Sequence, residues 1–150
     1  MLKLTQKSSA LPNPVSGTLT LTFDQRARSR LRTLLDDGRE AAVLLERGTQ
    51  LMPGETLLAE SGETVEIQAA LETLSIVRCE DPHQLARACY HLGNRHVALQ
   101  IEADELRDHH DHVLDDMVSL LGLEVEVHAA PFEPESGAYG AHAHIHGHEH

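Results

Sequence analysis

The last nine residues of the chain place a histidine at every second position: His142, His144, His146, His148 and His150. Neutral imidazole is the commonest side-chain ligand of metal ions in proteins. In an extended segment alternate side chains point the same way, so these imidazoles can share one edge. Such a tract suits borderline divalent ions, namely nickel, copper, zinc and cobalt. A solvated tail that binds metals incidentally and a purification tag are the alternatives, although a tag is usually an unbroken histidine run.

A second group of histidines lies in the stretch DHHDH, residues 108–112. His110 and His112 are two positions apart, so they share a side only if the chain is still extended where the following helix begins. Asp108 and Asp111 could then complete or orient an imidazole site. The alternative is a solvated helix N-terminus, at which the acidic residues favour the helix dipole and the histidines are bystanders.

His96 stands alone, between the end of a predicted helix and the start of a predicted strand. A rigid scaffold can present a metal ligand at such an exposed junction. A single histidine there could equally cap the helix or bond to a carbonyl group. An H-x-H motif with aspartate could in principle hold a hydrolytic metal. The sequence contains no recognisable HExxH motif, nucleophile–base pair or glycine-rich phosphate loop, so we do not expect an enzyme.

The composition favours a cation over nucleic acid as the partner. Lys and Arg total 12 against 24 Asp and Glu, which gives a formal net charge of -12, whereas phosphate binding depends on basic surface. Met1–Ala10 lacks a signal-peptide pattern and no apolar run could span a membrane, so we expect a cytoplasmic protein without a membrane partner. Cys79 and Cys89 form no CxxC motif and predict neither a disulfide framework nor a thiolate metal site.

Residues 1–70 read as a small β domain. Gly17–Phe23 alternates leucine with threonine, and further short strands are expected near Leu57–Leu58 and Val65–Ile67. The turn at Asp36–Gly38 predicts a hairpin. The apolar runs on either side of it have high helix propensity, but we interpret them as strands.

Four arginines support that interpretation, because they recur at every second position: Arg26, Arg28, Arg30 and Arg32. On a strand they would form one basic row, whereas on a helix they would scatter around the axis. The row is a candidate docking edge for an acidic partner, with a solvated sheet face as the alternative.

Residues 71–130 predict a β-α-β-β-α-β order, which is the ferredoxin-like plan. The expected elements are a strand ending at Glu80, a helix from Asp81 to Gly93, strands over 96–104 and 105–108, a helix over 111–122 and a strand over 123–129 with Leu123, Val125 and Val127 inward. Residues 131–150 are expected to be a linker and a disordered histidine-rich tail. The overall fold class is therefore α+β.

Several long motifs closely resemble the urease accessory protein E family of nickel metallochaperones. They are ACYHLGNRHVALQI (88–101), RDHHDHVLDDM (107–117) and PFEPESGAYG followed by the histidine-rich end. DQRARSRLR and the DDGRE hairpin also look like the family's N-terminal domain. The resemblance runs from about Thr18 to His150, with Ala98 where many members have proline.

The resemblance implies a function that the residues alone left open. The protein would deliver Ni(II) to apo-urease as a homodimer formed through the ferredoxin-like domain. Its N-terminal domain would be similar to a peptide-binding domain of co-chaperones. His96 would bind nickel together with its mate from the second subunit, His110 and His112 would be further ligands, and the tail would bind additional ions, including Cu(II) or Zn(II).

The implied partners are the urease accessory GTPase and the urease–accessory protein complex. Two other functions remain as alternatives. One is a nickel, zinc or copper buffer or storage protein that acts through the tail. The other is a peptide-binding chaperone module whose metal binding is secondary.

Overall fold

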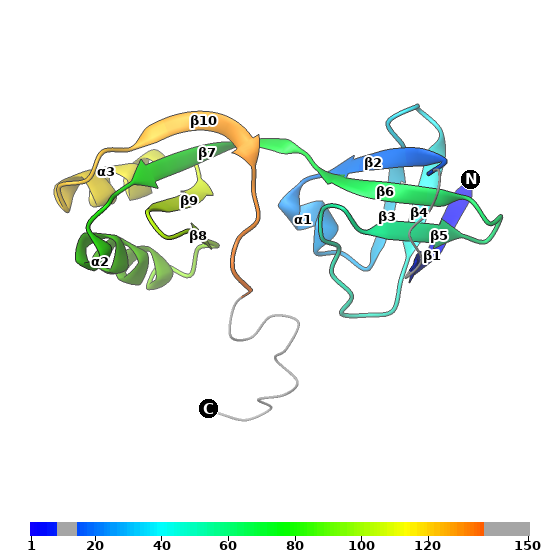
Figure 1. The fold of residues 1–150 in the computed structure, drawn as a ribbon, viewed down its shortest axis with the longest axis horizontal. Helices are drawn as coiled ribbons and strands as arrows, with labels where there is room; N and C mark the ends of the chain where they lie inside the picture. Colours follow the sequence, from blue (N-terminus) through cyan, green and yellow to red (C-terminus); the bar gives the residue numbers. More distant parts are fainter. Residues whose placement is uncertain (9–14, 137–150) are drawn as a thin grey trace, which may run out of the picture. The chain divides into compact units, whose positions relative to one another are not determined.

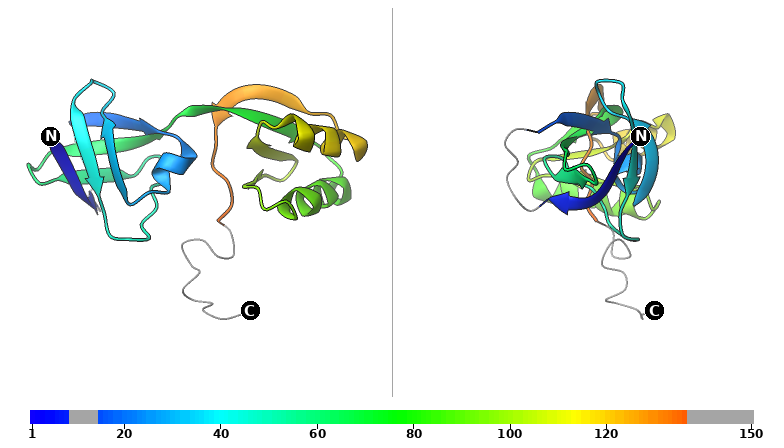
Figure 2. Two further views of the ribbon diagram at one scale, coloured as in Figure 1. Left: turned by 180° about the vertical axis from the view of Figure 1, so that it is seen from behind. Right: turned by 90° about the vertical axis from the view of Figure 1, so that its right-hand side faces the viewer.

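The computed structural model describes residues 1–8 and 15–136, and the chain divides into two compact units, Met1–Ala70 and Leu71–His150 (Figures 1 and 2). Each unit has its own sheet and its own core. Among the described residues, no helix is long and apolar enough to cross a membrane.

The first unit is built on a six-stranded sheet in the order β2-β6-β5-β1-β4-β3. Its strands are β1 (Leu2–Ser8), β2 (Gly17–Leu21), β3 (Arg30–Leu34), β4 (Glu40–Leu44), β5 (Thr56–Ala59) and β6 (Thr64–Ala69). β1 and β4 run parallel, as do β2 and β6, and the remaining neighbours are antiparallel. The predicted hairpin is confirmed, because Gly38 takes the positive φ of +93° between β3 and β4.

The core of this unit is aliphatic, as expected from a chain with 3% aromatic residues. Leucine, valine and isoleucine side chains fill it with no exposed surface: Leu4, Leu19, Leu21, Val43, Leu57, Val65 and Ile67. They alternate with outward side chains along their strands, which is the pattern of a sheet with one buried face.

The prediction of one basic row from Arg26 to Arg32 is wrong. Phe23–Arg26 forms a short helix, α1, and the Arg26 side chain is buried, donating from Nη1 to the Leu21 carbonyl oxygen at 2.8 Å. The reason is a capping box: the Thr22 hydroxyl accepts from the Gln25 N–H, and the Gln25 side chain accepts from the Thr22 N–H. Only Arg30 and Arg32 remain on one strand.

The second unit has the predicted order β-α-β-β-α-β and a four-stranded antiparallel sheet in the order β10-β7-β9-β8. Its elements are β7 (Leu71–Arg78), α2 (Pro82–Gly93), β8 (Gln100–Ile101), β9 (Glu105–His109), α3 (His112–Leu120) and β10 (Glu126–Pro131). The expected N-cap of α2 is confirmed, because the Asp81 carboxylate accepts from the His83 and Gln84 N–H groups.

Both helices bury their apolar faces in one core with the sheet. Leu85, Ala88 and Leu92 of α2 and Leu114 and Val118 of α3 share a buried cluster with Val77 of β7 and Leu106 of β9. His96 follows α2 and His110 precedes α3, so this core fixes the positions of the two segments that carry these candidate ligands.

The end of the second unit differs from the prediction. The Val127 side chain is 46% exposed rather than inward, and β8 contains only two of the nine residues expected to be extended over 96–104. The ordered chain also continues beyond residue 130: Phe132 is fully buried and its ring centre lies 4.6 Å from that of His109. The Glu135 N–H then donates to the Leu99 carbonyl at 2.7 Å, so the first residues of the expected linker contact the second unit.

Candidate metal site

His96 lies in the turn that follows α2. The helix ends at Gly93, Asn94 is its C-cap, and the His96 N–H donates to the Gly93 carbonyl oxygen at 2.9 Å. His96 has a φ of +58°, and it is the only non-glycine residue with positive φ in the part of the chain that the structure describes. Its side chain is exposed.

The backbone conformation of His96 carries a cost. A residue with a Cβ in the left-handed region is less stable than glycine there by about 1–2 kcal/mol. The left-handed residue that follows a helix end is usually glycine; here it is His96, two residues beyond the C-cap Asn94. A strained and exposed histidine, held on a short turn between a capped helix and the sheet, is a sign of a functional position.

His110 lies just after β9. Its N–H donates to the Thr73 carbonyl oxygen at 3.1 Å. Its ring Nδ1 lies 3.0 Å from Asp115 Oδ2 and 3.2 Å from Ser75 Oγ. An ionised Asp115 accepts, so it favours the tautomer with hydrogen on Nδ1, which leaves the Nε2 lone pair for a ligand.

The carboxylate that orients His110 is therefore Asp115, and the expectation of Asp108 or Asp111 in this role is wrong. Asp111 is instead the N-cap of α3, and its Oδ1 accepts from the Val113 N–H at 2.8 Å and the Leu114 N–H at 3.3 Å. Asp108 faces inward from β9, opposite Ser75 of β7, and is 3% exposed.

Burial and, after it, the nearby negative charge of Asp115 raise the pKa of Asp108 to about 7, while the charge of His109 opposes the shift. Its Oδ2 has no hydrogen-bond partner among the described residues. A buried carboxyl of this kind holds its proton near neutral pH.

His112 is the first residue of α3 and is exposed. It follows Asp111, whose backbone is extended (φ −154°, ψ 118°). Within residues 1–8 and 15–136, no three His, Cys, Asp or Glu side chains are grouped so that they could hold a metal ion. One chain therefore presents His96, His110 and His112 as separate groups. His142, His144, His146, His148 and His150 lie outside the described residues.

A cavity of about 270 Å³ lies beside His110, and His96 and His112 are not among its lining residues. Its wall is formed by Val97, Ala98, His109, His110, Asp111 and Leu114. Val97 and Ala98, which directly follow His96 and precede β8, thus line the same cavity as His110. Ala98, the residue found in place of the expected proline, is therefore part of the wall of this cavity.

Sequence reasoning missed Ser75 and Asp115, the two side chains that hold the His110 ring. Asp115 is five residues beyond His110, which is not a spacing at which side chains on one helix meet. Their contact exists because His110 precedes the helix and the chain turns at Asp111. The sequence pattern carries no signal for such a contact.

Two family models cover the chain almost completely. The model of the N-terminal domain of the UreE urease accessory protein matches residues 3–70, and that of its C-terminal domain matches residues 72–150. The chain belongs to the UreE urease accessory protein family. This confirms the resemblance drawn from the sequence motifs, and membership implies a role in urease maturation.

Relatives named urease accessory protein UreE match over most of their length. The protein from Citrobacter koseri is 58% identical over 153 residues, which cover 100% of both chains. The one from Pseudomonas putida is 61% identical over 131 residues, covering 87% of this chain and 78% of its own. The one from Escherichia coli O157:H7 is 50% identical over 150 residues, covering 99% of this chain and 97% of its own.

Proposed function

We propose that this UreE family member is a metallochaperone that carries Ni(II) and delivers it to apo-urease while the urease active site is assembled. The observation that carries the proposal is His96, an exposed imidazole held at a positive φ of +58° on the turn after α2. The rigid turn presents the ligand, and the exposure lets an acceptor protein reach the bound ion.

The proposed nickel site is completed by a second copy of the chain. A single imidazole is too small a ligand set, and the described residues of one chain contain no group of three potential ligands. A homodimer formed through the second unit would bring two His96 side chains together. That unit's antiparallel strand order, β10-β7-β9-β8, supports the ferredoxin-like plan that the resemblance implies.

His110 and His112 are the proposed further ligands. The His110 ring is held through Nδ1, which leaves Nε2 for the metal. Water or tail imidazoles would fill the remaining coordination positions of the His96 pair. An incomplete shell suits transfer, because an incoming ligand from the acceptor can attack the ion without first displacing a protein group.

The proposed partners are the urease accessory GTPase and the urease–accessory protein complex, and the protein itself is not a catalyst. Copper binds imidazole at least as well as nickel, so preference for nickel must come from coordination geometry, metal supply or partner docking. The affinity should fall as the pH is lowered, since protons compete with the metal ion for imidazole nitrogen.

Calorimetric nickel titration of three proteins tests the site: the full chain, a truncation that ends at Ala141, and that truncation with His96→Ala. The proposal expects one tight nickel ion per dimer in the truncation and its loss with His96→Ala. A urease activation assay on the full chain with His96→Ala should show the same loss.

The histidine-rich tail supports one second candidate, a nickel, zinc or copper buffer. In that case removal of the tail would abolish all tight binding and His96→Ala would change nothing. This outcome would replace the metallochaperone by the buffer.

A further inference from the structure

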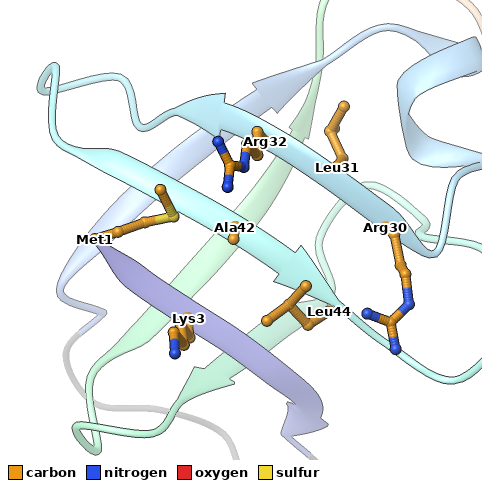
Figure 3. Close-up of a pocket in the computed structure, with 7 residues that line it drawn as sticks. All are labelled: Met1, Lys3, Arg30, Leu31, Arg32, Ala42 and Leu44. Atoms are coloured by element: carbon orange, nitrogen blue, oxygen red, sulfur yellow. The ribbon is translucent and has the colours of Figure 1, made fainter.

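The first unit carries a groove of about 370 Å³ on the outer face of β1, β4 and β3 (Figure 3). Its lining residues are Met1, Lys3, Arg30, Leu31, Arg32, Ala42 and Leu44. Three of these side chains are cationic and the others are apolar. The groove is therefore unlike the rest of a chain whose formal net charge is -12.

The strand register explains how the groove forms. Lys3 of β1 and Arg32 of β3 both pair with Ala42 of β4, and Arg30 pairs with Leu44. Ala42 and Leu44 alternate along β4 with Val43, which is buried in the core, so they face the other way. The result is a small apolar floor at Ala42 and Leu44 with cations on both sides, as Figure 3 shows.

Within the part of the chain that the structure describes, no ion pair involves Lys3, Arg30 or Arg32. Some cations elsewhere on the surface do have such partners, for example Lys7 with Glu55 at 3.0 Å and Arg39 with Glu63 at 2.9 Å, whereas others, such as Arg47, have none among the described residues. Among the described residues, three neighbouring cations thus lie together without an ion-pair partner, in a chain with twice as many acidic as basic residues.

We propose that this groove binds an extended acidic segment of a partner protein. Arg30 and Arg32 are two positions apart on one strand, so they repeat at about 6.8 Å. Carboxylates at alternate positions of an extended segment repeat at the same distance and can face both arginines. Lys3 lies across Ala42 from Arg32, at about two strand spacings or roughly 10 Å, and can bind a further carboxylate of that segment.

An acidic peptide fits this surface better than nucleic acid does. A nucleic acid extends beyond a patch of three cations and meets the negative charge of the remaining surface, which repels it. The apolar floor at Ala42 and Leu44 also suits an aliphatic side chain rather than a phosphate. The proposal goes beyond the proposed nickel function, because it assigns partner docking to a surface in the first unit.

The test uses the metal-free full chain and a fluorescein-labelled octapeptide with glutamate at alternate positions and a central leucine. Fluorescence anisotropy at low salt should show saturable binding. The variant with Arg30→Gln and Arg32→Gln should bind about tenfold more weakly, because each exposed ion pair contributes roughly two- to fivefold in affinity. Arg47→Gln removes an exposed arginine outside the groove and should change the affinity less than about twofold.

Several results would overturn the proposal. They are an absence of saturable binding, equal affinity of the double variant and the Arg47→Gln control, and displacement of the peptide by single-stranded DNA of equal charge at equal concentration. NMR shift mapping gives a readout without any variant. Shifts at β1, β3 and β4 support the groove, and shifts confined to the second unit contradict it. A nickel titration of the same proteins reports on the metal site separately.

Discussion

Replacing Asp108 by asparagine should stabilise the second unit at alkaline pH. Asp108 is 3% exposed, and burial raises its pKa from 3.8 to about 7. The folded state keeps the proton that the unfolded chain releases, so the stability this group contributes is present in full below pH 3.8 and is lost as the pH rises to about 7. Asparagine cannot ionise and escapes this loss.

The size of the effect follows from the pH interval. Between pH 5 and pH 7 the loss extends over two pH units at 1.36 kcal/mol each, or about 3 kcal/mol, and above pH 7 it stays constant. The advantage of Asp108→Asn in the free energy of unfolding should therefore grow by about 3 kcal/mol from pH 5 to pH 8.

Urea unfolding in the presence of a chelator measures this difference. Circular dichroism at 222 nm reports mainly on the second unit, because α2 and α3 are the longest helices of the described chain. Asp116→Asn, an exposed residue of α3, is the matched control and should show no such trend. If the stability difference for Asp108→Asn is the same at pH 5 and pH 8, the burial argument is refuted.

Three further perturbations test other parts of the second unit. Phe132→Ala should lower the free energy of unfolding by about 3–5 kcal/mol, because it empties a fully buried site; an effect as small as that of the exposed control Val127→Ala would contradict its anchoring role. Asp111→Ala should cost about 1 kcal/mol in urea unfolding through the lost N-cap of α3, and no loss would mean that the cap is not needed. His96→Gly should gain about 1 kcal/mol by relieving the positive φ while calorimetry shows tight nickel binding abolished; a loss of stability would argue against backbone strain.

The sequence predicted the elements of the second unit because each has a local signal. Asp81 with Pro82 marks the start of α2, and the alternation of apolar residues marks the strands. The length of β8 was overestimated, and the reason is also local. The alternation from Val97 to Ile101 is real, but the turn that ends with His96 uses the chain that a longer strand would need.

The error at Arg26 could have been avoided. Thr22 and Gln25 are spaced three residues apart, which is the signature of a capping box and indicates a helix start. The recurrence of arginine at every second position led to the strand interpretation instead. By contrast, the contact of Asp115 with His110 depends on how the chain turns at the N-cap, and only the folded structure shows it.

The contact of the chain after β10 with the segment near His96 determines the local concentration of tail imidazole there. The Glu135 N–H is bonded to the carbonyl of Leu99, only three residues from His96. His142 follows seven residues later, and such a segment spans at most about 25 Å, so its Cα is never more than roughly 35 Å from that of His96. One imidazole confined to that volume corresponds to an effective concentration in the millimolar range. Dilution of the protein therefore cannot separate the tail from His96, and any exchange of an ion between them would be independent of how much protein the cell makes.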